Sequence, residues 1–154
     1  MKISTLMSYA HGFGGASQEI VELEKAGLDV VWVPEAYSFD AVSAMGYLAA
    51  KTERITIASG ILNIYSRTPS LLAMTAAGLD ELSNGRFMLG LGASGPQVVE
   101  GFHGVPYDAP VTRIREIVEI CRNVWLREDK LNYAGKKYQI PLPKDQGTGL
   151  GIQI

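Results

Sequence analysis

The 154-residue sequence contains one cysteine and two histidines. Cys121 has no second cysteine with which to form a disulfide within the chain, which favours a reducing compartment. No spacing of His, Cys and carboxylate residues suggests a metal site. Cys121 falls on an apolar helical stripe, so we interpret it as a core residue.

Charge and long apolar runs are also scarce. Charged residues make up 19% of the chain, the net charge is −2, and the basic residues are scattered. This pattern offers no footprint for nucleic acid or an anionic membrane surface. The longest apolar stretch, residues 71–79, is too short to span a bilayer, and no secretory cleavage site follows residues 1–9. We expect a cytoplasmic protein that acts on a small-molecule substrate.

What the sequence does contain is a regular alternation of strand and helix patterns. The predicted strands are residues 3–7, 29–34, 55–59 and 87–91, and the predicted helices are residues 17–26, 40–51, 71–82 and 111–126. Strands begin roughly every 26 to 32 residues, the spacing of a βαβ unit. Such units build parallel sheets with right-handed crossovers. The fold class is therefore α/β.

Two architectures fit this alternation, an open doubly wound sheet and a (β/α)₈ barrel. A complete barrel needs about 250 residues, so this chain would supply roughly half of one. Residues 130–140 differ and predict a short hairpin that turns at residues 134–136. We expect one domain over residues 1–154, with about four βα units and a C-terminal hairpin and loop segment.

A glycine-rich loop follows the fourth predicted strand. Residues 90–95 satisfy the G-x-G-x-x-G pattern of dinucleotide sites, which is a weak signal alone. Its context is unsuitable, because Pro96 follows the third glycine, helix signals resume only near Val111, and the expected acidic residue is absent. The loop could instead bring its backbone close to another ligand, or be a turn with no ligand.

Two residues at the ends of predicted strands are candidate catalytic groups. Glu35 ends a buried apolar strand, where a barrel places its working side chains, although a cap or ion pair would equally suit a rim carboxylate. His11 lies just past the first strand and could orient or protonate a substrate. Asn63 follows the third strand. Asp40 is interpreted as a helix cap.

Four segments, in order, resemble the luciferase-like family, in the branch that uses the deazaflavin coenzyme F420. They are residues 31–35, residues 57–61 with 67–69, residues 79–92 and residues 101–106, the third being the longest match. The resemblance implies the first half of a TIM-barrel-like fold, with the cofactor over the carboxyl ends of its parallel strands. It also implies a non-proline cis peptide at Gly60–Ile61. The implied cofactor-binding residues are Gly60, Ile61, Asn63, Gly92, Ala93, Ser94 and Gly95.

The implied chemistry is hydride transfer with F420 or flavin-dependent monooxygenation with FMN, and the sequence style favours F420. Ala36 and Gly95 stand where sugar-phosphate-oxidising relatives have a histidine and an acid, which argues against that activity. One alternative is a truncated, non-catalytic half-barrel, and another is a dinucleotide-binding open sheet. Because a half-barrel leaves strand edges unpaired, we expect a homo-oligomer.

Overall fold

The computed structural model describes residues 1–10, 12–37 and 39–142. These residues form two compact units, the first comprising residues 1–62 and 78–91 and the second residues 63–77 and those from 92 onward. In the described ranges, no helix combines the length and apolar character needed to cross a membrane.

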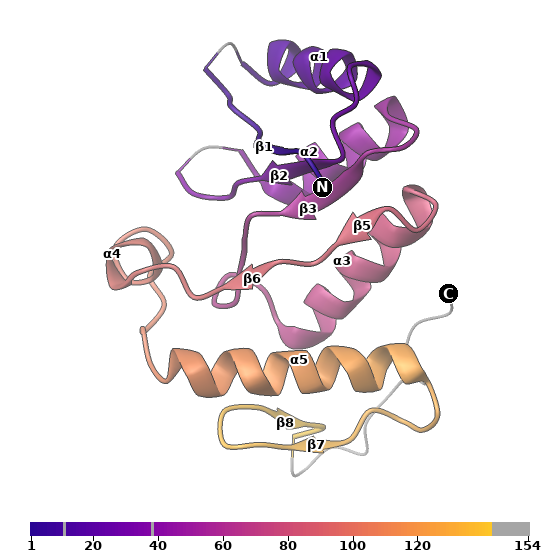
Figure 1. Cartoon of the computed structure of the whole chain (residues 1–154). Helices are drawn as coiled ribbons and strands as arrows, with labels where there is room; N and C mark the ends of the chain where they lie inside the picture. The colour runs from indigo at the N-terminus through magenta and orange to yellow at the C-terminus, as the bar shows by residue number, and fades with distance from the viewer. Residues whose placement is uncertain (11, 38, 143–154) are drawn as a thin grey trace. The chain divides into compact units, whose positions relative to one another are not determined.

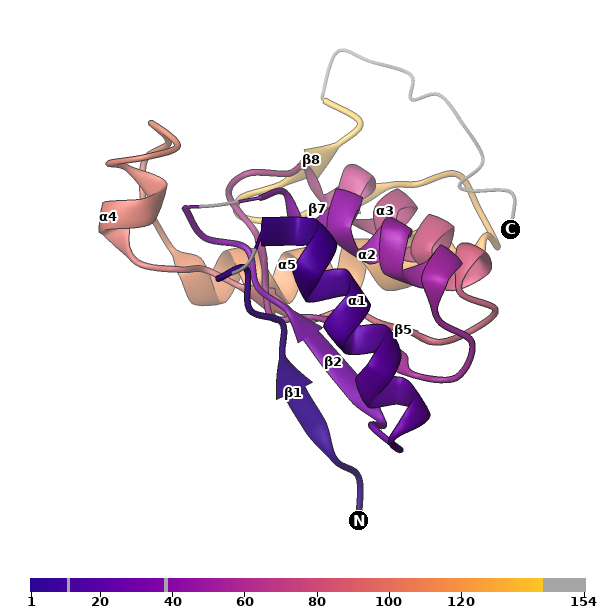
Figure 2. The ribbon, with the colours of Figure 1, turned by 90° about the horizontal axis from the view of Figure 1, so that it is seen from above.

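The first unit is built on a four-stranded parallel sheet. Its strands are β1 (Ser4–Leu6), β2 (Val30–Val33), β3 (Thr56–Ser59) and β5 (Phe87–Met88), hydrogen-bonded in that order (Figure 1). The helices α1 (Gly12–Lys25) and α2 (Ala41–Lys51) lie on one side of this sheet (Figure 2). The order follows the chain without the reversal of a doubly wound sheet. The predicted parallel α/β class is confirmed.

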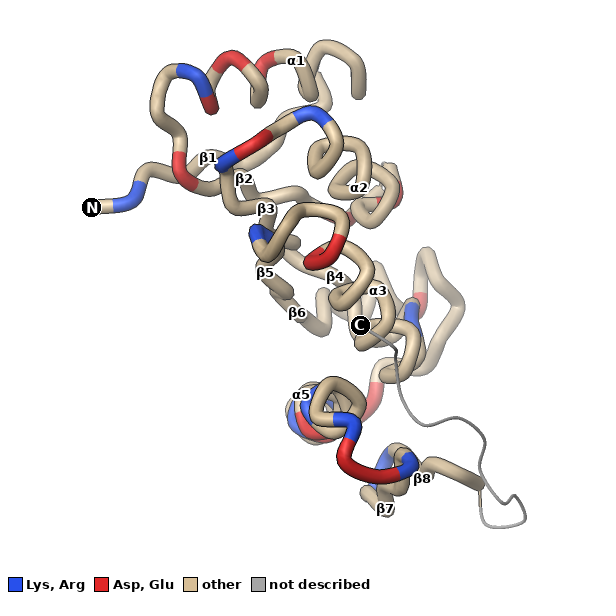
Figure 3. The backbone as a smooth tube through the Cα atoms, turned by 90° about the vertical axis from the view of Figure 1, so that its right-hand side faces the viewer, with Lys and Arg blue, Asp and Glu red and all other residues tan. Residues whose placement is uncertain are grey.

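Burial explains why these segments are strands. In β2, Val31 and Val33 are fully buried and Trp32 is half-buried, so the continuous apolar run meets protein on both faces. Ile57 and Ala58 are equally buried in β3. The strands carry no charged residue, and Figure 3 shows the charges on helices and connecting segments.

Helix α2 begins as its sequence predicts. The Asp40 side chain accepts a hydrogen bond from the backbone N–H of Ser43 at 2.8 Å, which confirms Asp40 as the helix cap. Met45 and Leu48 are fully buried on the face turned away from solvent. The cap and the apolar stripe together fix where α2 starts and how it is rotated.

A buried carboxylate links α1 to the start of β3. Glu24 accepts hydrogen bonds from the backbone N–H groups of Glu53, Arg54 and Ile55 at 2.7–3.2 Å. Burial opposes ionisation of Glu24, but these donors and the charge of Arg86 lower its pKa below the ordinary value. The carboxylate therefore satisfies donors of a turn that lacks regular secondary structure.

The fourth predicted strand, residues 87–91, is interrupted in the structure. β5 ends at Met88, and β6 (Leu91–Gly92) pairs instead with β4 (Leu62–Asn63). The predicted start of the first helix is also late, because α1 begins at Gly12. The expectation that helix resumes only near Val111 was wrong as well, since a short helix, α4 (Pro96–Val99), follows Gly95 directly.

The second unit contains α5 (Pro110–Leu126) and an antiparallel hairpin of β7 (Tyr133–Ala134) and β8 (Gln139–Ile140), which confirms the predicted hairpin. Its turn spans residues 135–138, slightly later than predicted. The helix α3 (Pro69–Leu82) begins two residues before the predicted range 71–82, at Pro69, and its first residues belong to this unit.

The buried face of α5 differs in part from the prediction. Cys121 is buried, as predicted, and burial raises the pKa of its thiol to about 11. Ile114 and Val118, which helical periodicity places on the same stripe as Cys121, are only half-buried, while Ile117 and Ile120 are fully buried. The buried face of α5 is therefore rotated relative to the apolar stripe that the sequence shows. It includes Glu116, although helical periodicity places this residue on the solvent-exposed face.

Glu116 holds the hairpin against α5. Its carboxylate accepts hydrogen bonds from the backbone N–H groups of Lys136, Lys137 and Tyr138 at 2.7–3.0 Å. Burial raises the pKa of Glu116, but these donors and the charge of Arg113 outweigh it, so the pKa is lowered. Each unit thus contains one buried carboxylate that organises a turn through three backbone donors.

Replacing Glu24 with Gln removes the charge that three backbone donors face, and we expect a loss of about 2 kcal/mol in the free energy of unfolding. The folded pKa is lowered, so this stabilisation is present above the ordinary value of 4.5 and disappears as pH falls through the folded pKa. Chemical denaturation at pH 7 and pH 3 measures both effects. Glu19→Gln, on the exposed face of α1, is the control; equal stability of the two variants at pH 7 would contradict the assignment.

Candidate functional site

Glu35 lies two residues beyond β2, at the edge where the parallel strands of the first unit end. It is half-buried, and its Oε1 accepts a hydrogen bond from the backbone N–H of Ala41 at 3.2 Å. That N–H is the first of α2, so Glu35 helps to cap the helix. The structure places Glu35 at the predicted rim, and its catalytic role stays a prediction.

The other predicted catalytic residue, His11, lies outside the described residues. Near it in the chain, sequence reasoning missed Tyr9. The Tyr9 hydroxyl is buried and has no hydrogen-bond partner in the described part of the chain. Its position three residues after β1, at the same sheet edge as Glu35, could have indicated a site residue.

The end of β3 carries the predicted backbone feature. The peptide bond between Gly60 and Ile61 is cis, as the resemblance implied. A Cβ atom added at Gly60 would lie 3.2 Å from Cβ of Trp32, so a side chain at position 60 would require Trp32 to shift by a few tenths of an ångström. The Gly60–Ile61 peptide bond therefore lies directly beside Trp32 of β2.

Ser59 and Gly90 bind each other closely in the first unit. The Ser59 hydroxyl donates to the carbonyl oxygen of Gly90 at 2.8 Å and accepts from its N–H at 2.7 Å. A Cβ atom added at Gly90 would lie 2.1 Å from the carbonyl oxygen of Ser59. No side chain fits there without movement of the backbone. The N–H of Gly90 bonds the Ser59 hydroxyl instead of a backbone carbonyl, and the predicted strand 87–91 is interrupted here.

Asn63, in the second unit, is only 2% exposed. Its Oδ1 accepts a hydrogen bond from the N–H of Tyr65 at 2.9 Å, and its carbonyl oxygen accepts one from the Ser66 hydroxyl. Its Nδ2 is buried without an acceptor among the residues the structure describes. The side chain is therefore held by its oxygen and carries an unused amide donor.

The loop of residues 92–95 follows β6 in the same unit. The Gly92 carbonyl oxygen accepts from the N–H of Ile64 at 3.0 Å, and the Gly95 carbonyl oxygen accepts from N–H groups of α4. Ser94 has φ 53°, a left-handed conformation that is uncommon for serine and frequent at ligand clamps. Ala93 is half-buried and Ser94 is exposed, so the loop presents small side chains.

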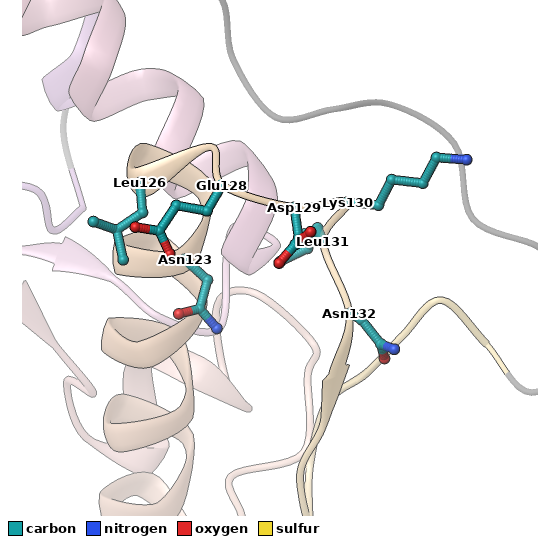
Figure 4. Close-up of a pocket in the computed structure, with 7 residues that line it drawn as sticks. All are labelled: Asn123, Leu126, Glu128, Asp129, Lys130, Leu131 and Asn132. Carbon is teal, nitrogen blue, oxygen red and sulfur yellow. The ribbon is translucent and has the colours of Figure 1, made fainter.

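The second unit also contains a cavity of about 480 Å³ that no sequence pattern indicated. The guanidinium of Arg113 lies over the rings of Tyr65 and Tyr138 at its wall and pairs with Asp108 at 2.6 Å. A smaller hollow of about 290 Å³ follows the end of α5, with Glu128, Asp129 and Lys130 among its lining residues (Figure 4). Neither includes a predicted site residue. Within the described ranges, no three metal-ligating side chains gather into a metal site.

Comparison with known proteins identifies the family. The model of the luciferase-like monooxygenase family matches residues 2–151. The chain belongs to this family. It is 42% identical over 132 residues to a Mycobacterium tuberculosis protein named "Putative coenzyme F420-dependent oxidoreductase", covering 86% of this chain and 38% of that protein.

Solved structures of the family share the fold. The coenzyme F420-dependent tetrahydromethanopterin reductase from Methanopyrus kandleri matches with a TM-score of 0.75 and 25% identity over 90% of this chain and 43% of its own. The oxygenating constituent of 3,6-diketocamphane monooxygenase from Pseudomonas putida, in complex with FMN, matches with a TM-score of 0.78 and 20% identity over 90% and 44%. The chain spans about two-fifths of these relatives and has the fold of roughly the first half of their (β/α)₈ barrel.

We expect Gly90→Ala to destabilise the protein by about 1–3 kcal/mol, because the added methyl group overlaps the Ser59 carbonyl oxygen. Gly78→Ala is the matched control, since a Cβ at that helical position meets nothing within 4 Å, and alanine favours helix. Thermal unfolding of both variants measures the difference. A Gly90→Ala protein as stable as Gly78→Ala would show that the approach of Ser59 is not required.

Proposed function

We propose that this chain carries cofactor-binding residues of an F420-dependent oxidoreductase that transfers hydride to or from a small molecule. Membership of the luciferase-like family supports an oxidoreductase. The preference for F420 over FMN rests on the 42% identical mycobacterial relative and its name. The cofactor would supply the hydride acceptor or donor, and the protein would supply position and exclusion of water.

Asn63 is the observation that carries the proposal. A buried amide donor without an acceptor costs free energy, so such groups are rare unless a ligand or water satisfies them. Its oxygen is already used by the chain, which leaves Nδ2 to donate to a carbonyl oxygen. The pyrimidine ring of flavins and deazaflavins presents carbonyl oxygens, so Asn63 fits an edge of such a ring.

The backbone features fit the same group. The cis bond after β3 lies where the family resemblance expects support for the ring of the cofactor, and it is present here between Gly60 and Ile61. In the second unit, the small residues Gly92, Ala93, Ser94 and Gly95 would let a ligand approach the backbone closely. We assign Gly60 and Ile61 to cofactor binding on the first observation, and residues 92–95 on the second.

Glu35 is the group we assign to the substrate. Its place beyond β2 is where barrel enzymes of this type carry reacting side chains. A carboxylate there can accept a proton from a hydroxyl group or hold the substrate by a hydrogen bond. His11 stays a second candidate for the same task.

Binding of F420 and FMN tests the proposal directly. We expect the chain, or a longer chain that includes the rest of the barrel, to bind F420 more tightly than FMN in titrations followed by cofactor fluorescence. Asn63→Asp and Asn63→Leu both remove the donor, and each should weaken F420 binding at least about tenfold. Thermal unfolding of both variants serves as the folding control. Failure of the longer chain to bind either cofactor would overturn the proposed function.

The alternative, a half-barrel that associates with itself, is favoured by the strand order of the first unit. Among the described strands, β1 and β5 each have one neighbour in the sheet, and unpaired edges promote association. We expect size-exclusion chromatography with light scattering to give at least a dimer. A stable monomer at micromolar concentration would contradict this expectation.

A further inference from the structure

Tyr9 lies in the segment that follows β1, and Glu35 lies in the segment that follows β2. The two strands are parallel neighbours, so both residues emerge at the same edge of the sheet. The charges of Glu35 and Asp40 reach the phenol, since both contribute to raising its pKa after the larger effect of burial. Tyr9 therefore stays a protonated donor at neutral pH.

The orientation of Tyr9 is unusual for a tyrosine that is only half-buried. Such residues normally turn the hydroxyl toward water and bury the ring. In Tyr9 the hydroxyl oxygen is the buried part, and no described residue receives its hydrogen bond. An inward hydroxyl without a partner among the described residues costs free energy, and a bound molecule that accepts its hydrogen bond would remove that cost.

The ring of Tyr9 cannot easily turn to relieve this. It stacks with Phe13 at 6.4 Å between centroids and meets the edge of Phe39 at 5.2 Å. Phe13 and Phe39 also contact each other, at 6.2 Å, so the three rings support one another. The hydroxyl is thus held in place before any ligand arrives.

The surroundings restrict the kind of ligand. Phe39 is 50% exposed and offers apolar surface next to Tyr9. The carboxylates of Glu35 and Asp40 place negative charge beside Tyr9, whereas the ammonium of Lys51 lies over the ring of Tyr47. An anionic group would be repelled at this rim, whereas a neutral molecule would be accepted.

We propose that Tyr9 is a substrate-positioning residue whose hydroxyl donates a hydrogen bond to an oxygen of a neutral, largely apolar substrate packed against Phe39. This assignment rests on the proposed oxidoreductase function for its place in catalysis, but the binding itself depends only on the first unit. It adds to Glu35 a second, uncharged polar contact at the strand edge.

Tyr9→Phe tests the assignment in the free protein, because it removes only the hydroxyl and keeps the ring. We expect a melting temperature unchanged or raised by about 2–4 °C, since an unpaired buried donor is lost. Tyr47→Phe is the matched control, as Tyr47 belongs to the same group of rings through Phe13 but is 43% exposed. A fall in melting temperature for Tyr9→Phe alone would mean that the hydroxyl makes a structural bond, and would overturn the proposal.

Ligand-detected NMR with three probes of similar size tests the binding. Acetophenone has an acceptor oxygen, ethylbenzene lacks it, and benzoate is anionic. We expect the wild-type chain to bind acetophenone about tenfold more tightly than either of the others, and Tyr9→Phe to lose this preference while Tyr47→Phe retains it. Equal binding of acetophenone and ethylbenzene by the wild-type chain, or an unchanged preference in Tyr9→Phe, would overturn the proposal.

Titration of the variants with F420 and FMN separates this inference from the proposed function. We expect Tyr9→Phe to bind the cofactors as the wild type does. If the wild type binds neither cofactor but keeps its hydroxyl-dependent preference for acetophenone, the proposed function fails and the Tyr9 site stands. If F420 binds and the acetophenone preference is absent, the Tyr9 assignment alone fails.

Discussion

The contact between Ser59 and Gly90 is the constraint on which the candidate site depends. One hydroxyl binds both the N–H and the carbonyl of a glycine that is 31 residues away in sequence. The cis bond begins at the next residue after Ser59, and the loop of residues 92–95 begins two residues after Gly90. Both segments that we propose for cofactor binding therefore start directly beyond this contact. A larger residue at position 90 would shift their starting points as well as the sheet.

Periodicity predicted the four parallel strands of the main sheet and the four long helices, but not β4, β6 or α4, and the family resemblance predicted the cis bond at Gly60–Ile61. Neither could predict the interruption of residues 87–91, because its cause is the approach of Ser59 from a distant part of the sequence. The buried positions of Glu24 and Glu116 could not be predicted for another reason. Acidic residues on helices normally face water, and only the folded chain shows that each meets three backbone donors.

The candidate site was predicted unevenly. Asn63 was identified from its place after a strand, but the pairing of its oxygen and the unused Nδ2 depend on the local turn at Tyr65. Tyr9 was overlooked, because an aromatic residue in a glycine-rich loop resembles a packing residue. Its distinguishing property is the burial of one atom, which no sequence pattern records. Among the described residues, each unit thus contains a buried donor without an acceptor, Tyr9 in the first and Asn63 in the second.

The first unit is discontinuous in sequence, since residues 63–77 of the second unit separate its two segments. β5, the last strand of its sheet, comes from the later segment. During synthesis, the nascent chain therefore exposes the open edge of β3 until residue 88 has left the ribosome, and the intervening segment must emerge first. The sheet of the first unit can therefore be completed only after residues 63–77 of the second unit have been synthesised.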